Sequence, residues 1–216
     1  SLAGATVDEG GTAAVAFGPV TDPSAVDVAA GFRYAFDFNN DGTFDLGDGT
    51  YAGSSAAAAP AVPAALLADS GTYTVRAWVI DRDEGHTEYT ATLTVRNVAP
   101  TAVLTGGNVP EGSAAVVSFG SIVEPSPVDR ASLRFAYDFD NDGVFDLGGS
   151  TYATGVTDAA PPLPASIGAN GPNGTTVRAR IYDKDGGVNE YTTTVTVQNV
   201  APTATLAARK IPFVDR

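Results

Sequence analysis

Apolar and polar residues alternate with a period of two along much of this chain. The clearest runs lie at residues 31–38, 71–81, 87–96, 133–139, 177–181 and 191–197. Successive side chains of a β-strand point to opposite faces, so these runs predict strands with one buried face. Shorter strands are expected at residues 2–7 and 12–17, and Gly, Pro and Asp/Asn clusters separate the runs. Helical periodicity of useful length is absent, so the fold class is all-β.

The strands belong to two internal repeats. Residues 97–101 read Asn-Val-Ala-Pro-Thr and return as residues 199–203, an offset of 102 (199 minus 97). About seven short strands in each repeat of roughly a hundred residues predict an antiparallel Ig-like β-sandwich. We therefore expect two tandem sandwiches at residues 1–98 and 99–200, with residues 201–216 forming a tail that resembles the first strand of a further repeat.

The tail allows two interpretations. It is either the cut end of a longer array or a strand that completes a neighbouring molecule by strand addition, which would give a homopolymer. We favour the longer array, because cutting a repetitive protein anywhere produces such ends. The role of residues 207–216 is left open.

An acidic loop follows the third expected strand of each repeat and has the ligand spacing of a calcium loop. Oxygen ligands are expected at its first, third, fifth and ninth positions, a main-chain carbonyl at the seventh, and glycine at the sixth. These positions are Asp37, Asn39, Asp41, Thr43 and Asp45 in the first repeat, and Asp138, Asp140, Asp142, Val144 and Asp146 in the second. The preceding strand excludes an EF-hand. The alternative is an Asn-Asp-Gly turn whose carboxylates cap backbone amides.

A second acidic cluster recurs between the last two expected strands of each repeat. It could share a metal with acids at the repeat starts and with the linker asparagine. The candidate ligands are then Glu9, Asp81, Asp83, Asn97, Glu111, Asp183 and Asp185. One interpretation is a calcium site between the domains, similar to cadherin junctions. The other is hairpin chemistry, since Asp-Gly pairs favour tight turns.

The charge is consistent with cations as partners. The chain carries 25 acidic and 12 basic residues, a net charge of −13, so binding to nucleic acid or to an anionic membrane surface is disfavoured. Cysteine is absent, which excludes disulfides and zinc-thiolate sites. The longest apolar run, residues 56–68, is too short to span a bilayer. Acidic, cysteine-free chains of this composition suit bacterial extracellular or cell-surface proteins.

The sequence does not favour an enzyme. The sequence has no Gly-x-Ser-x-Gly elbow, no phosphate loop with lysine, and a single histidine, His86. Trp78, the only tryptophan, falls on the outer face of its strand. It is either a surface aromatic packed against its neighbours or a platform for a glycan or surface receptor.

These motifs together resemble the PKD (polycystic kidney disease) domain family. The residues that carry the resemblance are 71–75 (Gly-Thr-Tyr-Thr-Val), 109–113 (Val-Pro-Glu-Gly-Ser), 137–143 (Tyr-Asp-Phe-Asp-Asn-Asp-Gly), 183–187 (Asp-Lys-Asp-Gly-Gly) and 199–203. The family's usual Trp-Asp-Phe is replaced by Phe36-Asp37-Phe38 and Tyr137-Asp138-Phe139, and its Gly-Asp-Gly turn by the longer acidic loop.

The resemblance implies Ig-like modules that serve as spacers, adhesive units or accessory domains, without catalysis of their own. We therefore expect a calcium-stabilised (Ca2+) structural segment of an extracellular stalk, adhesin or fibre. The alternative is a carbohydrate- or protein-binding accessory module of a secreted hydrolase. Partners are expected to be neighbouring domains of the same or identical chains.

Overall fold

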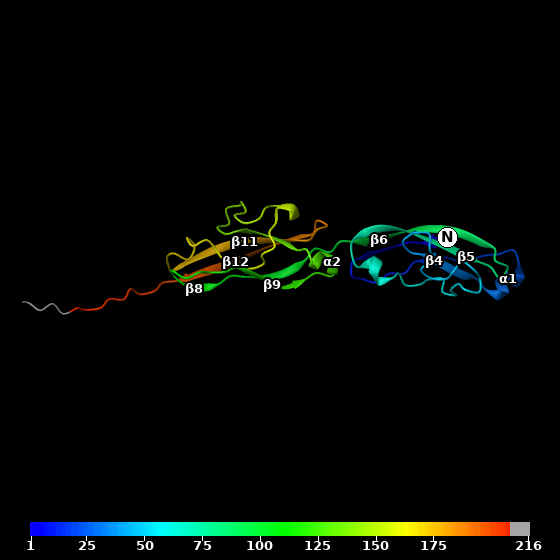
Figure 1. Ribbon diagram of the computed structural model, residues 1–216, viewed down its shortest axis with the longest axis horizontal. Helices are drawn as coiled ribbons and strands as arrows, with labels where there is room; N and C mark the ends of the chain where they lie inside the picture. The colour runs from blue at the N-terminus through cyan, green and yellow to red at the C-terminus, as the bar shows by residue number, and fades with distance from the viewer. Residues whose placement is uncertain (208–216) are drawn as a thin grey trace, which may run out of the picture.

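The protein consists of two β-sandwiches joined end to end (Figure 1), as seen in a computed structural model that describes residues 1–207. In each, a four-stranded sheet faces a two-stranded one. The chain therefore has the all-β architecture of two tandem Ig-like sandwiches that the sequence predicts. Each sheet and each hydrophobic core lies within one repeat. We refer to the two sandwiches as domain 1 and domain 2.

Domain 1 is built from the strands that the alternation predicts, with shifted ends. Its larger sheet has the order β2 (Ala5–Asp8), β6 (His86–Arg96), β5 (Gly71–Ile80) and β4 (Arg33–Asp37), and its smaller sheet pairs β1 (Leu2–Ala3) with β3 (Ala16–Phe17). Phe36, Val75 and Leu93 are fully buried between the sheets. The inward-facing residues of the periodic runs thus form the core, because burying apolar surface is the main driving force for folding.

Domain 2 repeats this arrangement. Its larger sheet has the order β10 (Arg134–Asp138), β11 (Asn173–Tyr182), β12 (Val188–Gln198) and β8 (Asn108–Pro110), and its smaller sheet pairs β7 (Thr101–Thr105) with β9 (Ser118–Val123). Tyr137, Val177 and Val195 take the core places of Phe36, Val75 and Leu93.

The first strand of each repeat differs from the prediction. Instead of running unbroken over residues 2–7, it divides into β1, in the smaller sheet, and β2, in the larger one. A strand that changes sheets closes one corner of a sandwich. As a result β2 pairs parallel to β6, and β8 pairs parallel to β12, whereas the other strand pairs of the described chain are antiparallel.

Short helices that the periodicity did not predict lie between the strands. They are α1 (Ala25–Ala30), α2 (Pro127–Arg130) and the 3-10 turns η1 (Ala64–Leu67) and η2 (Tyr152–Thr154). Helices of one or two turns are too short to produce a hydrophobic period. Figure 1 shows α2 at the end of domain 2 that faces domain 1, and α1 at the opposite, free end of domain 1.

The tail shows no strand in its described part. Residues 201–207 have no regular secondary structure and are exposed. The remainder of the predicted strand-addition segment, residues 208–216, lies outside the described residues. No helix within residues 1–207 has the length and apolar content needed to cross a bilayer.

Candidate functional site

The densest group of carboxylates lies where the two domains meet. Domain 2 contributes one end of its sandwich, made of α2, the segment before it and the hairpin turn between β11 and β12. Domain 1 contributes the end of β2, the segment after η1 and the linker that begins at Asn97. We call this group the junction cluster, and its members are Glu9, Asp69, Asn97, Glu124, Asp129, Asp183 and Asp185.

The domain 2 carboxylates are held in place by backbone amides. Glu124 Oε1 accepts a hydrogen bond from the Ser126 amide at 3.0 Å, and Ser126 caps α2 by accepting from the Asp129 amide at 3.1 Å. Asp183 Oδ1 accepts from the amides of Asp185 and Gly187 at 2.9 and 2.7 Å, which fixes the hairpin turn. The side chains of Glu124, Asp129 and Asp183 are almost completely buried.

Domain 1 and the linker complete the cluster from the other side. Glu9 Oε1 accepts from the Val98 amide at 2.8 Å, and Asn97 Nδ2 donates to Asp183 Oδ2 at 3.0 Å. Ser70 Oγ donates to Asp185 Oδ2 at 2.9 Å. The Asn97 contact joins the linker to domain 2, and the Ser70 contact joins domain 1 to domain 2. The cluster therefore exists only when the domains are docked.

Several buried oxygens of the cluster remain without a hydrogen bond. Within residues 1–207, Glu9 Oε2, Asn97 Oδ1, Glu124 Oε2 and Asp129 Oδ2 have no partner. Asp129 Oδ1 also has no well-formed hydrogen bond, although it lies 3.1 Å from the Lys184 ammonium. A buried polar atom without a partner costs roughly 1–3 kcal/mol, and more when it is charged. Such a concentration of unpartnered oxygens is what a bound cation would relieve.

Lys184 neutralises the outer side of the cluster. Its Nζ lies 2.7 Å from Asp69 Oδ1 and 2.6 Å from Asp185 Oδ2, both partly exposed. Burial lowers the pKa of Lys184, but its hydrogen bonds with Asp185, Asp69 and Asp129 outweigh burial and hold that pKa above its ordinary value. The ammonium therefore stays charged, yet it does not reach the inner oxygens of Glu9 and Glu124.

The inner carboxylates hold their protons more tightly than usual. Burial raises the pKa of Glu124 to about 7, and the nearby Glu9, Asp129 and Asp183 add to the shift. Burial is also the largest cause of the raised pKa of Glu9 and of Asp129. Near neutral pH the charged form of these carboxylates is thus disfavoured, and a bound divalent cation would stabilise it.

Calcium fits this donor set better than softer metals do. All of the unpartnered atoms are carboxylate or amide oxygens, the ligands that calcium takes in sets of six to eight. Glu9, Asp69, Asp129 and Asp185 also offer carboxylate oxygens that lie within 4.8 Å of one another. Glu124, Asp183 and Asn97 could supply the remaining ligands, and no Cys is available to favour zinc.

The structure divides the seven predicted residues of the second acidic cluster among three places. Glu9, Asn97, Asp183 and Asp185 come together at the junction. Asp81 and Asp83 lie at the free end of domain 1, where the Asp81 carboxylate accepts from the Asp83 and Gly85 amides at 2.9 and 2.8 Å. Glu111 lies at the far end of domain 2, where its oxygens accept from the amides of Val200 and Gly171.

Three members of the junction cluster were not predicted. Asp69, Glu124 and Asp129 lie in segments without β-periodicity, so no pattern in the sequence indicates that they approach Asp183. A signal was nevertheless available in the repeat. Both copies carry an acid, Pro, Ser and a second acid at matching places, namely Asp22, Pro23, Ser24 and Asp27, then Glu124, Pro125, Ser126 and Asp129.

In both central loops the first and ninth carboxylates accept hydrogen bonds from backbone amides. Asp138 Oδ1 and Oδ2 accept from the Asp142 and Gly143 amides at 3.1 and 2.9 Å, and Asp146 Oδ2 accepts from the Phe139 amide at 2.7 Å. Arg178 Nη2 lies 2.8 Å from Asp138 Oδ2. In the first loop Asp37, Asp45 and Arg76 make the corresponding contacts. Amide capping, the alternative interpretation, is therefore present in both loops.

The two loops differ in their capacity for a cation. Asp138, Asp140 and Asp146 place carboxylate oxygens within 4.8 Å of one another. Desolvation and the neighbouring Asp142 and Asp146 raise the pKa of Asp140. The first loop has Asn39 at the place of Asp140, so its group has one carboxylate fewer. Thr43 and Val144, the expected carbonyl ligands, are exposed beside the glycine.

Trp78 is packed against its neighbours on the outer face of β5. Its ring stacks on His86 at 3.9 Å between centroids and meets the edge of Phe44 at 5.0 Å. Its Nε1 donates to Glu88 Oε2 at 2.8 Å. These contacts favour the packing interpretation over a ligand platform, because the ring face on the His86 side is already covered.

Comparison with known proteins gives likeness of fold alone. No family model matches the chain, and no curated protein matches it. Among solved structures it resembles the fibronectin(III)-like modules of Clostridium thermocellum CbhA (15% identity, 96% of each chain, TM-score 0.33). It also resembles the insect immune protein hemolin (11% identity, 91% of this chain and 44% of that one, TM-score 0.44) and Drosophila N-cadherin EC1-4 (11%, 90% and 47%, TM-score 0.34). At these identities and TM-scores the likenesses carry no argument about function.

Proposed function

We propose that this chain is a structural segment of an extracellular stalk, adhesin or fibre, in which calcium bound at the junction cluster fixes one sandwich on the next. Membership of the PKD family is part of this proposal and rests on the sequence motifs. The observation that carries it is the set of buried, unpartnered oxygens from Glu9, Asn97, Glu124 and Asp129 at the domain junction.

The arrangement of these residues explains why calcium would act on stiffness. Glu9 belongs to domain 1, Asn97 to the linker, and Glu124 and Asp129 to domain 2. Without a cation, mutual repulsion among the carboxylates favours separation of the domains. With calcium, the same groups become ligands of one ion and can no longer move independently. Extracellular calcium levels would keep such a site loaded, so the segment behaves as a rod.

Calcium titration tests the site. We expect calorimetry to show binding and the melting temperature to rise, because a ligand that binds only the native state adds about 2.7 kcal/mol at a hundred times its Kd. Asp129→Asn should remove most of this gain. Asp158→Asn, which removes an exposed carboxylate that belongs to none of the acidic groups described, is the control and should retain it. Equal calcium responses of the two variants would refute the junction site.

Small-angle scattering tests the mechanical consequence. In calcium the distance distribution should match two sandwiches held end to end as in Figure 1. In chelator it should broaden toward shorter maximal distances as the linker bends. An unchanged distribution would show that the junction is rigid without a cation.

The second central loop is a further calcium candidate. Its support is the proximity of the Asp138, Asp140 and Asp146 carboxylates. A cation there would stabilise a turn within domain 2 and would leave the junction unaffected. The two sites are therefore separable by variants.

A further inference from the structure

The two repeats differ at one place on the outer face of the larger sheet. Trp78 of β5 and Arg180 of β11 stand at the same position of the repeat, and each lies opposite a glutamate of the next strand. Trp78 Nε1 donates to Glu88 Oε2 at 2.8 Å. Arg180 Nε donates to Glu190 Oε2 at 2.7 Å. The exchange therefore preserves the contact with the glutamate and changes what lies beside it.

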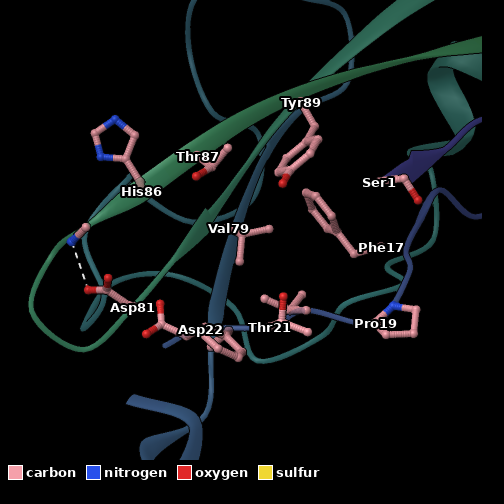
Figure 2. A pocket seen from close by; sticks show the side chains of 13 residues that line it. Ser1, Phe17, Pro19, Thr21, Asp22, Val79, Asp81, His86, Thr87 and Tyr89 are labelled. Atoms are coloured by element: carbon pink, nitrogen blue, oxygen red, sulfur yellow. Dashed lines mark hydrogen bonds between the residues drawn. The ribbon is translucent and has the colours of Figure 1, made fainter. Parts of the chain in front are cut away.

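In domain 1 the Trp78 ring fills the space beside this contact. The ring stacks on His86 and meets the edge of Phe44, and a Cβ added at Gly49 would lie 3.4 Å from it. Figure 2 shows the His86 ring directed away from Tyr89, which packs against the domain 1 core. The stack of Trp78 on His86 thus covers the outer side of the sheet.

In domain 2 the same place is a hollow of about 390 Å³. One side of it is apolar, because it is formed by the Phe145 ring and by Val144, which is 68% exposed. Ser150 and Arg180 lie on its polar side, and the Arg180 Cζ is 5.2 Å from the centroid of the Phe145 ring. None of the described residues that line the hollow is acidic. The hollow therefore combines an apolar wall with N–H and O–H donors.

Two further exchanges between the repeats change the charge and polarity of this place. Ser150 stands where domain 1 has Gly49, and Gly149 stands where it has Asp48. Relative to domain 1, the place has thus gained a guanidinium and a hydroxyl and has lost a carboxylate. On a chain whose net charge is −13, this hollow is a local attraction for an anion.

Arg180 has hydrogen-bond donors available for a ligand. The hydrogen bond to Glu190 outweighs burial and, with a weaker one to Tyr182, holds the pKa of Arg180 above its ordinary value, so the guanidinium stays charged. A guanidinium carries five N–H donors, and these two partners leave three of them. Arg178 is instead fully engaged, because its Nε and Nη2 donate to Asp138 and its Nη1 lies 3.4 Å from Glu190. Of the two arginines that line the hollow, Arg180 is therefore the one that can bind an anion.

A carboxylate carried on a hydroxylated carbon ring fits these groups. The planar guanidinium matches a carboxylate with two parallel hydrogen bonds. Val144 and Phe145 can pack against C–H groups, and the Ser150 hydroxyl can donate to or accept from a ring hydroxyl. The volume lies near the lower end of the roughly 300–1,000 Å³ of ligand pockets, so it suits a single sugar residue. A uronate combines these features, whereas an acidic peptide side chain has no hydroxyl for Ser150.

We propose that the hollow of domain 2 binds one uronate residue of an acidic polysaccharide. The Arg180 guanidinium holds the carboxylate, Ser150 contacts a ring hydroxyl, and Val144 and Phe145 cover the C–H face. In domain 1 the Trp78 ring occupies this place, so the site belongs to domain 2. The acidic surface disfavours a long polyanion, and contact is therefore confined to a short stretch of sugar around the hollow. The site goes beyond the proposed structural function and requires no calcium.

Titration of the full chain with digalacturonate in chelator, followed by amide NMR, tests the proposal. We expect a Kd on the order of 1 mM, with the largest shifts at Ser150 and Arg180. Arg180→Trp installs the domain 1 residue, so the fold and the contact with Glu190 should be kept while binding weakens roughly tenfold or more. Arg180→Lys keeps the charge without the planar fork and should also weaken binding. Arg82→Gln, which removes an exposed charge from domain 1, should leave binding unchanged.

Two further probes identify the group that is recognised. The dimethyl ester of digalacturonate keeps the rings and lacks the charges, so it should bind roughly tenfold more weakly or worse. An acetylated glutamate dipeptide of matched charge represents an acidic peptide and should bind less tightly than digalacturonate. Tighter binding of the dipeptide, equal binding by wild type and Arg180→Trp, or the absence of shifts at Ser150 and Arg180 overturns the proposal. Because every titration is made in chelator, such a failure leaves the calcium junction unaffected.

Discussion

Glu9 and Glu111 show how the same residue behaves with and without a facing domain. Both sit at the start of a repeat and accept a hydrogen bond from the valine amide of an Asn-Val-Ala-Pro-Thr segment. Hydrogen bonds from the Val200 and Gly171 amides lower the pKa of Glu111. Burial against domain 2 raises the pKa of Glu9 instead, and the carboxylates of Asp129 and Asp183 contribute. The junction, rather than the repeat itself, creates the unfavourable carboxylates.

The raised pKa of Glu124 predicts that, in the absence of metal, the free energy of unfolding falls as the pH rises toward neutral. The unfolded carboxyl loses its proton near 4.5 and the folded one near 7, so the contribution of Glu124 is fully present below pH 4.5 and is lost as the pH rises to about 7. Because each unit of difference between the folded and unfolded pKa corresponds to 1.36 kcal/mol, the stability lost approaches about 3 kcal/mol. Urea unfolding in chelator at several pH values measures it.

Glu124→Gln is the control for this titration. It should flatten the pH profile in chelator, because the side chain no longer ionises. Calcium should reverse the wild-type slope, since it binds the deprotonated carboxylate. A wild-type profile in chelator that rises from pH 5 to pH 7 would contradict the burial of an unpaired Glu124.

Removing the Lys184 ammonium should strengthen calcium binding. Lys184→Met keeps the apolar stem but deletes the positive charge that pairs with Asp69, Asp129 and Asp185. We expect calcium affinity to increase about fivefold, corresponding to about 1 kcal/mol for an incompletely buried pair. The calcium-free protein should become less stable. Lower calcium affinity in this variant would show that Lys184 positions the ligands rather than competing with the ion.

At the scale of elements, the alternation of residues predicted most of the strands but few of the cluster contacts. Strands β5, β6, β11 and β12 are long enough for the period of two to be visible, and they lie where it places them. The short strands β1 and β3 and the helix α2 lack any usable period. Asp69 and Asp129 lie in or beside such segments, and only the folded chain brings them to Asp185. A hairpin-turn cap and a member of an acidic cluster are alternative roles for Asp183 in the sequence. In the structure Asp183 has both, because it accepts from the Gly187 amide in the turn and from Asn97 in the junction cluster.

The two central loops allow a reciprocal exchange to test the loop calcium site. Asp140→Asn should abolish a calcium effect confined to the second loop, and Asn39→Asp should create one in the first, because the loops otherwise make the same amide contacts. Calcium titration by calorimetry in an Asp129→Asn background isolates this signal from the junction. If neither exchange changes the titration, the loop carboxylates serve as amide caps alone.

At the scale of the whole molecule, the junction works only if the domain ends approach closely. Gly10 has a φ of 71°, and a Cβ added there would lie 2.9 Å from Pro125 Cβ of domain 2. Gly112 has a φ of 77° at the far end of domain 2, and an added Cβ would meet no described atom within 4 Å. The two glycines therefore share a backbone conformation and differ in what faces them.

This pair separates backbone strain from domain docking. Gly10→Ala and Gly112→Ala should each lose roughly 1–2 kcal/mol from the left-handed conformation. Gly10→Ala should in addition displace domain 2, so its calcium affinity falls and its scattering profile in calcium resembles that of the wild type in chelator. Gly112→Ala should keep wild-type calcium binding and the extended profile. Because the local strain is matched, any difference between the variants reports the contact with Pro125, and identical behaviour would show that calcium binding does not depend on how closely the domains dock.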